Sequence, residues 1–89
     1  DWAAVRLRAM AHIAPPPGTT DVDDRDDACA DAMEGDLSRL VELATDAGWQ
    51  RGEVMVAILS LTVTDLLNHA GADVTLQLLA DAADGIRAR

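Results

Sequence analysis

An uncharged segment in the middle of the chain constrains the fold more than any other feature. Residues 54–64, VMVAILSLTVT, contain eight apolar side chains, two threonines and one serine. The chain is only 89 residues long, and a protein of this size buries roughly 60% of its unfolded surface, so its own core is thin. An apolar segment of this kind therefore has to be covered by most of the remaining chain or by a partner.

The residues around this segment predict a helix over residues 51–70. Trp49 and Val54 have the spacing of a hydrophobic staple across a helix start, and Gly71 is a suitable residue to end the helix. A strand is the alternative, because apolar and polar side chains alternate in residues 59–64. We favour the helix, since no other segment of the chain has a pattern that would pair with a lone strand.

The rest of the sequence predicts an all-α fold. Of the 89 residues, 17 are Ala and 11 are Leu, and Phe and Tyr are absent, which is a composition typical of helices. Apolar side chains recur at helical spacing in three further segments. We expect a short helix over residues 1–13, a Pro-rich linker over residues 14–22, and helices over residues 23–47 and 74–88. With residues 51–70 as the central helix, these elements make a small helical bundle in a single domain, residues 1–89.

Local signals predict where two of these helices begin and end. Thr20, Asp21 or Asp23 is expected to cap the first long helix, because short polar side chains accept hydrogen bonds from the free N–H groups of a helix start. Gly48 follows that helix where a glycine commonly ends one. Asp73 is expected to cap the last helix.

The helix over residues 51–70 is expected to pair with a second copy of itself. Four residues line one of its faces: Val56, Leu59, Val63 and Leu66. The opposite face is apolar as well, and a helix that is apolar all round is normally buried on all sides. The other predicted helices are too few to cover both faces, so we predict a homodimer with these four residues at its interface. The alternative is a monomer in which the other helices enclose this one.

The charge of the chain limits its partners. The formal net charge is −9 and all seven basic residues are Arg; the missing Lys beside abundant Ala and Asp indicates a GC-rich coding sequence. Such a chain lacks the clustered positive charge that phosphate contacts need, which argues against direct binding to nucleic acid or to an anionic membrane. The single Cys and the absence of a secretory signal favour a cytoplasmic protein. The longest apolar run is shorter than the roughly 20 residues of a membrane span.

The acidic charge is concentrated in residues 20–36, TDVDDRDDACADAMEGD, which hold eight acids and one Arg. We predict that this segment presents an acidic helical face to a basic protein partner, or mimics nucleic acid towards a DNA-binding regulator. The expected contact residues are Asp23, Asp24, Asp26, Asp27 and Asp31. The alternative is a solvated acidic turn that only caps a helix.

The same acidic residues do not match a calcium-binding loop. An EF-hand loop needs Gly at its sixth position and Glu at its twelfth. Counted from Asp21, these positions hold Asp26 and Ala32. We therefore predict no metal site here.

No pattern in the chain indicates an enzyme. Nucleophile and phosphate-loop motifs are absent, and with no Lys and two His the chain has few groups for acid–base catalysis. Asp65 and His69 are expected to form an ion pair on one helix face, and Cys29 is expected to be a buried, unreactive thiol. We therefore predict no catalytic residue, no cofactor and no metal.

Two other functions remain open at this point. One is a helical module that binds a small molecule or a metal near Trp49, Val54 and Met55. The other is a subunit of a larger complex, in which a different protein covers the apolar helix.

Overall fold

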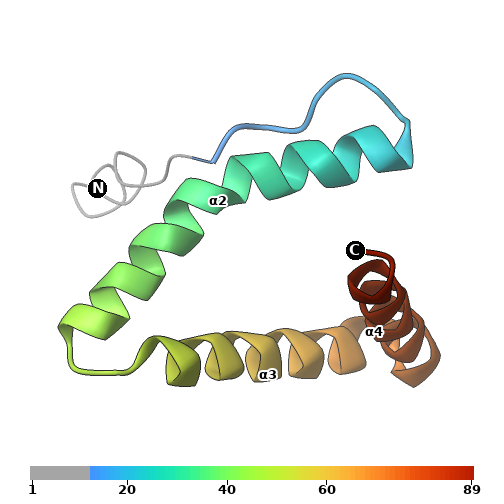
Figure 1. The fold of residues 1–89 in the computed structure, drawn as a ribbon. Coiled ribbons are helices and arrows are strands. Elements are labelled where there is room, and N and C mark those ends of the chain that lie inside the picture. Colours follow the sequence, from blue (N-terminus) through green and yellow to red (C-terminus); the bar gives the residue numbers. More distant parts are fainter. Residues whose placement is uncertain (1–12) are drawn as a thin grey trace. The chain divides into compact units, whose positions relative to one another are not determined.

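The computed structural model describes residues 13–89, and this part of the chain contains three helices and no strand (Figure 1). The helices are α2 (Val22–Asp46), α3 (Arg51–Ala70) and α4 (Ala72–Arg87). The prediction of an all-α protein is therefore confirmed.

The chain divides into two units, residues 1–49 and residues 50–89. The first unit contains α2, and the second contains α3 and α4. The short helix predicted over residues 1–13 lies outside the described residues except for Ile13. Residues 14–21 form neither helix nor strand.

The first helix, α2, begins one residue before the predicted position and has a side-chain cap. Of the three candidates for the cap, Asp21 takes this place, and its side chain accepts a hydrogen bond from the Asp24 N–H at 3.0 Å. Thr19 lies just before it, and its Oγ1 accepts a hydrogen bond from the Asp21 N–H at 3.1 Å. Short polar side chains thus accept hydrogen bonds from two backbone N–H groups at the start of α2, those of Asp21 and Asp24.

A Schellman motif ends α2. The Gly48 N–H donates to the carbonyl oxygen of Thr45 at 3.1 Å, and the Trp49 N–H donates to that of Ala44 at 3.1 Å. Gly48 has a φ of 114°, which a residue with a Cβ adopts only under strain. The glycine expected after this helix is therefore confirmed, and its backbone explains why α2 stops there.

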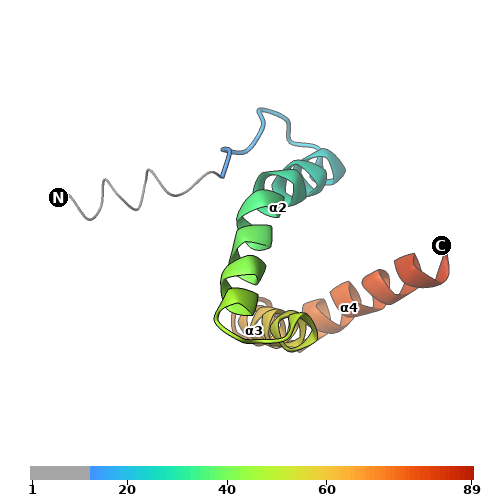
Figure 2. The ribbon, with the colours of Figure 1, turned by 60° about the vertical axis from the view of Figure 1, so that its left-hand side comes forward.

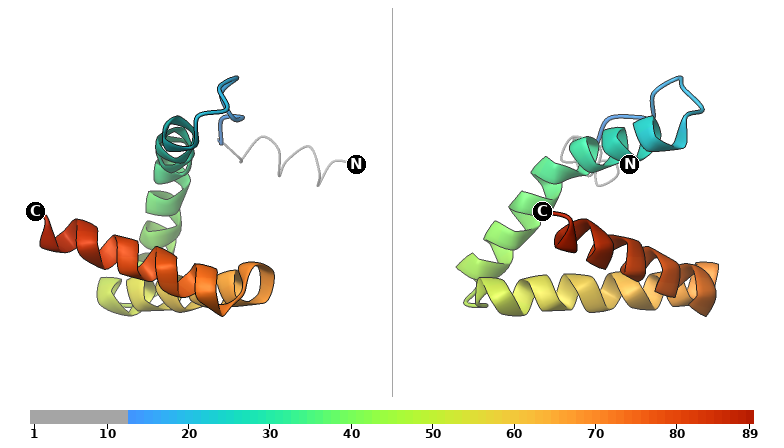
Figure 3. Two further views of the ribbon diagram at one scale, coloured as in Figure 1. Left: turned by 90° about the vertical axis from the view of Figure 1, so that its right-hand side faces the viewer. Right: turned by 45° about the vertical axis from the view of Figure 1, so that its right-hand side comes forward.

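Along its length α2 is bent near the middle, as two views of the ribbon show (Figures 1 and 3). Gly35 lies inside the helix, and a glycine within a helix weakens it and is a common element of bends. A Cβ atom added at Gly35 would meet no atom within 4 Å. Close packing against a neighbour therefore does not explain this glycine.

The uncharged segment forms α3, a helix with the predicted bounds of residues 51–70. The strand alternative is wrong, since residues 59–64 are helical throughout. Gln50 lies at the N-cap position without a side-chain cap hydrogen bond. Val54 is buried, whereas Trp49 is 61% exposed, and the proposed staple between them stays a prediction.

The last helix, α4, begins at Ala72 and not at residue 74. Asp73 therefore lies in the first turn and does not cap the helix, which corrects the sequence prediction. Gly71, with a φ of 87°, joins α3 directly to α4. Thr75 is 2% exposed, and its Oγ1 donates to the Gly71 carbonyl oxygen at 2.7 Å.

Few side chains are buried in the part of the chain that the structure describes. These are Val41 of α2, Val54 of α3 and Thr75 of α4. α3 and α4 contact each other, but α4 projects away from α3 beyond the turn at Gly71 (Figure 2). Because α4 alone does not enclose α3, the predicted bundle with α3 at its centre is not confirmed.

Candidate functional site

The acidic residues predicted to bind a partner lie on the first half of α2. Asp23, Asp27 and Asp31 follow one another at four-residue intervals, so they lie on one face of the helix within roughly 80° at about 100° per residue. Asp24 lies at one margin of this face, and Asp26 lies outside it, on the other side. We call Asp23, Asp24, Asp27 and Asp31 the acidic face of α2.

All five predicted residues, the acidic face and Asp26, are exposed to solvent. Among residues 13–89 the ion pairs are Asp65–His69 and Asp84–Arg87, and neither involves these carboxylates. Asp23 and Asp24 also lie in the first turn of α2, where the positive end of the helix dipole stabilises negative charge. The arrangement concentrates negative charge on a regular, exposed helical surface.

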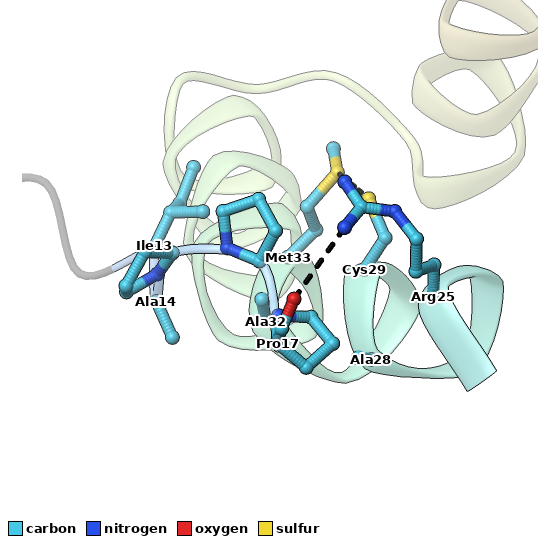
Figure 4. A pocket seen from close by; sticks show the side chains of 10 residues that line it. Ile13, Ala14, Pro17, Arg25, Ala28, Cys29, Ala32 and Met33 are labelled. Atoms are coloured by element: carbon cyan, nitrogen blue, oxygen red, sulfur yellow. Dashed lines mark hydrogen bonds between the residues drawn. The ribbon is translucent and has the colours of Figure 1, made fainter. Parts of the chain in front are cut away.

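The opposite side of α2 carries a groove, which the sequence did not predict. Residues 13–17 run back along α2, and the two segments line a cavity of about 260 Å³ (Figure 4). Its helical wall consists of Arg25, Ala28, Cys29, Ala32 and Met33. At about 100° per residue these side chains lie away from the acidic face of α2.

Arg25 connects the two walls of this groove. Its Nη1 donates to the carbonyl oxygen of Pro17 at 3.4 Å and to that of Thr19 at 3.5 Å. Pro17 cannot donate a backbone hydrogen bond, but its carbonyl oxygen remains an acceptor. The only basic residue of the acidic segment therefore holds the proline-rich chain beside α2 and does not neutralise the acidic face.

Cys29 is exposed, which corrects the prediction of a buried thiol. Its Sγ lies 3.8 Å from the Sδ of Met33, one helical turn further on. The spacing placed Cys29 correctly on the apolar side of α2, but in this part of the chain no other helix covers that side chain. A helical pattern shows which residues share a face and does not show what covers it.

The predicted dimer residues lie along one face of α3, and their exposure differs between its two halves. Val56 is 65% exposed and Leu59 is 56% exposed. Val63 and Leu66, nearer to the turn into α4, are half-buried. We call Val56, Leu59, Val63 and Leu66 the α3 seam.

The seam is not the only uncovered apolar surface of the second unit. On α3, Leu61 is 71% exposed, although it faces away from the seam. On α4 the exposed apolar side chains are Val74, Leu76, Leu78, Leu79 and Ile86. Exposed apolar side chains therefore lie on more than one face of α3 and along α4.

By length and composition, α3 is also apolar enough to cross a membrane. The mean hydropathy of its most apolar 18-residue window is 1.2, and only 6% of that window is buried. Ser60, Thr62 and Thr64 interrupt the longest apolar run without adding charge, so the length of that run understates how apolar the helix is. Helices in the core of soluble proteins can have the same length and hydropathy. These two properties therefore do not place α3 in a membrane.

Asp65 and His69 are in contact near the end of α3, as the spacing predicted. The His69 Nδ1 lies 3.2 Å from the Asp65 Oδ1 and 2.9 Å from the Asp65 carbonyl oxygen. Both side chains are about three-quarters exposed, so the pair is a surface interaction one helical turn apart.

The groove beside α2 does not coincide with the residues that the sequence left open for a ligand. Within residues 13–89, no three His, Cys, Asp or Glu side chains are placed to hold a metal ion. The groove beside α2 does not include Trp49, Val54 or Met55. The residues suggested for a small-molecule site therefore do not line it.

Comparison with known proteins found no match to the chain. No family model, no curated protein and no solved structure matches the chain.

Proposed function

We propose that the chain is a small acidic interaction protein that acts as a homodimer and presents the acidic face of α2 to a basic protein partner. The observation that carries the proposal is the exposed row of carboxylates, which has no ion-pair partner among residues 13–89. In this proposal residues 1–13 form a short helix, and residues 14–21 link it to α2.

The geometry of α2 suits a partner rich in Arg or Lys. Carboxylates at four-residue spacing present several acceptors to one side, and Arg side chains bind carboxylates in a bidentate manner. The Asp21 cap fixes the start of the helix, so the row is held on a regular element and not on a loose turn. Charge complementarity of this kind mainly raises the association rate and selects the partner.

Self-association supplies the cover that α3 lacks. The segment 54–64 has no charge, so a second copy brings no unpaired charge into that part of the interface. The α3 seam is then buried between the two copies, while the acidic face of α2 belongs to the other unit of the chain.

A second candidate is supported by the groove beside α2. Its volume of about 260 Å³ is close to the lower end of small-molecule pockets, which is roughly 300 Å³. Its walls are mostly apolar side chains of residues 13–17 and of α2, so it would take a small apolar molecule. Native mass spectrometry of the purified protein tests this candidate: a bound molecule at one per chain supports a ligand-binding module.

Neutralisation of the acidic face tests the main proposal. The variant carries Asp23→Asn, Asp24→Asn, Asp27→Asn and Asp31→Asn, and it keeps the Asp21 cap. A matched control removes four charges elsewhere, through Glu42→Gln, Asp46→Asn, Asp73→Asn and Asp81→Asn. The probe is a poly-arginine peptide, and its dissociation constant is measured across a series of salt concentrations.

We expect the acidic-face variant to bind the peptide at least tenfold more weakly and with a flatter salt dependence, because the clustered charge is gone. The control keeps most of the affinity. Equal losses in the two variants would show that only the net charge matters, and the acidic face would then be solvated surface.

A further inference from the structure

We propose that residues 1–12 form a helix that packs antiparallel along one side of α2, beyond the groove. The side of α2 that receives them is made by four residues, Met33, Asp36, Leu40 and Leu43, which we call the α2 strip. The inference uses the short N-terminal helix of the proposed function, and it depends on neither the homodimer nor the basic partner.

The α2 strip continues the side of the helix that carries the groove. At about 100° per residue its four members lie within roughly 80° of one another, and Arg25 and Cys29 of the groove wall fall in the same sector. The acidic face of α2 lies on the opposite side. A segment that covers the strip therefore leaves the acidic face open to a partner.

The path of residues 13–17 brings the chain to the first residue of the strip. Pro17 lies beside Arg25, whose Nη1 donates to its carbonyl oxygen at 3.4 Å. From there, four extended residues at about 3.1 Å each span about 12 Å, which equals about eight residues of helix. That distance reaches Met33, and Ile13 and Met33 both line the groove. Figure 1 shows this segment running back from the start of α2 towards its middle.

The length of the N-terminal segment matches the part of α2 that lies beyond the groove. Twelve residues of helix are about 18 Å long, and residues 34–46, which complete α2, are about 20 Å long. Because residues 13–17 join the segment to the strip, its effective concentration there is roughly millimolar. This favours residues 1–12 as the occupant over a separate molecule.

The pattern of residues 1–12 fits the α2 strip. The row Trp2, Val5, Ala9 and His12 has separations of three, four and three positions, and the strip has the same separations. This alternation keeps one face of a helix against a neighbouring helix. The path of residues 13–17 sets the antiparallel direction, and the facing pairs are then Trp2 with Leu43, Val5 with Leu40, Ala9 with Asp36, and His12 with Met33.

The exposure of α2 is consistent with a cover on this side. Within residues 22–36 only Ala28, Ala32 and Asp36 are partly covered, and their four-residue spacing places them along one line of the helix. That line begins in the groove wall and continues into the strip. The apolar members of the strip are still open to solvent: Met33, Leu40 and Leu43 are 49%, 53% and 61% exposed.

The charges of the two segments are complementary. Residues 1–12 carry Arg6 and Arg8 and one acid, Asp1, whereas residues 20–36 hold eight acids and one Arg. On a helix, Arg6 and Arg8 lie on either side of the row that faces α2, so both stay at the edge of the contact. Asp36 is the charged member of the strip, and the short side chain of Ala9 opposite leaves room for its carboxylate.

Disulfide cross-linking within one chain tests the arrangement. All variants carry Cys29→Ser, so the native thiol does not react. The test variant carries Val5→Cys with Leu40→Cys, and the control carries Leu7→Cys with Leu40→Cys. On a helix Leu7 lies roughly opposite Val5, and a disulfide needs Cα atoms within about 7 Å. Intact mass spectrometry of dilute, oxidised protein follows the intrachain disulfide.

We expect the intrachain disulfide to form roughly tenfold faster in the test variant than in the control, because a packed segment holds only one of the two positions against the strip. Equal rates would show that the segment does not settle on α2. Disulfides that form only between chains, in a mixture of Val5→Cys and Leu40→Cys proteins, would assign the strip to a second copy. Either result overturns the proposal.

Tryptophan fluorescence gives a second measurement that needs no cysteine. In a Trp49→Phe protein, Trp2 is the single emitter, and its emission should lie at shorter wavelength than in urea. Adding Leu43→Asp should remove that shift, whereas Ser38→Asp, at an exposed position outside the strip, should keep it. Emission unchanged between buffer and urea would contradict the packing of Trp2 on α2. Neither measurement involves the poly-arginine peptide, so failure here leaves the acidic-face proposal standing.

Discussion

The Asp21 carboxylate accepts a hydrogen bond from the backbone N–H of Asp24 at 3.0 Å, and this contact fixes where α2 begins. The acidic face of α2 starts two residues after the cap. The start of the helix and the position of the face therefore depend on the same aspartate, although Asp21 itself is not proposed as a partner contact.

Replacing the cap should destabilise α2. We expect Asp21→Ala to lower the free energy of unfolding by about 1 kcal/mol, because an N–H group of the first turn loses its partner. Asp26→Ala, an exposed substitution of the same type in the same helix, is the control and should cost less. Urea denaturation followed by circular dichroism measures both, and an equal effect of the two substitutions would contradict the role of the cap.

Two glycines of the first unit should respond in opposite directions to alanine. Gly48 has a φ of 114°, so Gly48→Ala forces an L-residue into the left-handed region and should destabilise the protein by roughly 1–2 kcal/mol. Gly35→Ala lies within α2 with free space around the new methyl group, and it should stabilise the helix by up to about 1 kcal/mol. Thermal unfolding of both variants tests this, and destabilisation by Gly35→Ala would show that the bend in α2 is required.

The turn between α3 and α4 depends on Thr75. Its Oγ1 donates to the Gly71 carbonyl oxygen at 2.7 Å, and the residue is 2% exposed. We expect Thr75→Val to cost about 1 kcal/mol, because the shape is kept and the hydrogen bond is lost. Thr64→Val, at an exposed position of α3, should have little effect; a comparable loss there would mean that Thr75 contributes no specific bond.

Local signals in the sequence were sufficient to predict that α2, α3 and α4 are helices, but not every helix end. The bounds of α3 agree with the prediction because Gly71 and the residues around Gln50 lie within one turn of the helix ends. A short stretch of sequence at each end is therefore enough to predict where this helix begins and ends. The start of α4 was misplaced because Asp73 is a good cap residue by type. The structure joins the two helices through Gly71 alone, and Thr75 bonds back to it.

Contacts between segments could not be predicted in the same way. The groove beside α2 arises because residues 13–17 run back along the helix and Arg25 bonds to the Pro17 carbonyl oxygen. The periodicity of apolar residues does not predict that residues 13–17 run along α2. Cys29 was expected to be buried for a related reason: its place on an apolar stripe is a property of the helix, whereas its burial depends on which other segment covers it.

The most direct test of the homodimer is the mass of the protein in solution, measured for the unmodified chain and for variants with one Asp introduced into α3. Light scattering should give the unmodified chain a mass of twice 9.4 kDa, and Leu59→Asp, in the seam, should convert it to a monomer. Leu61→Asp, two residues away on a different face of the same helix, should remain a dimer. A mass of one chain for the unmodified protein, or loss of the dimer with Leu61→Asp but not with Leu59→Asp, would contradict the account.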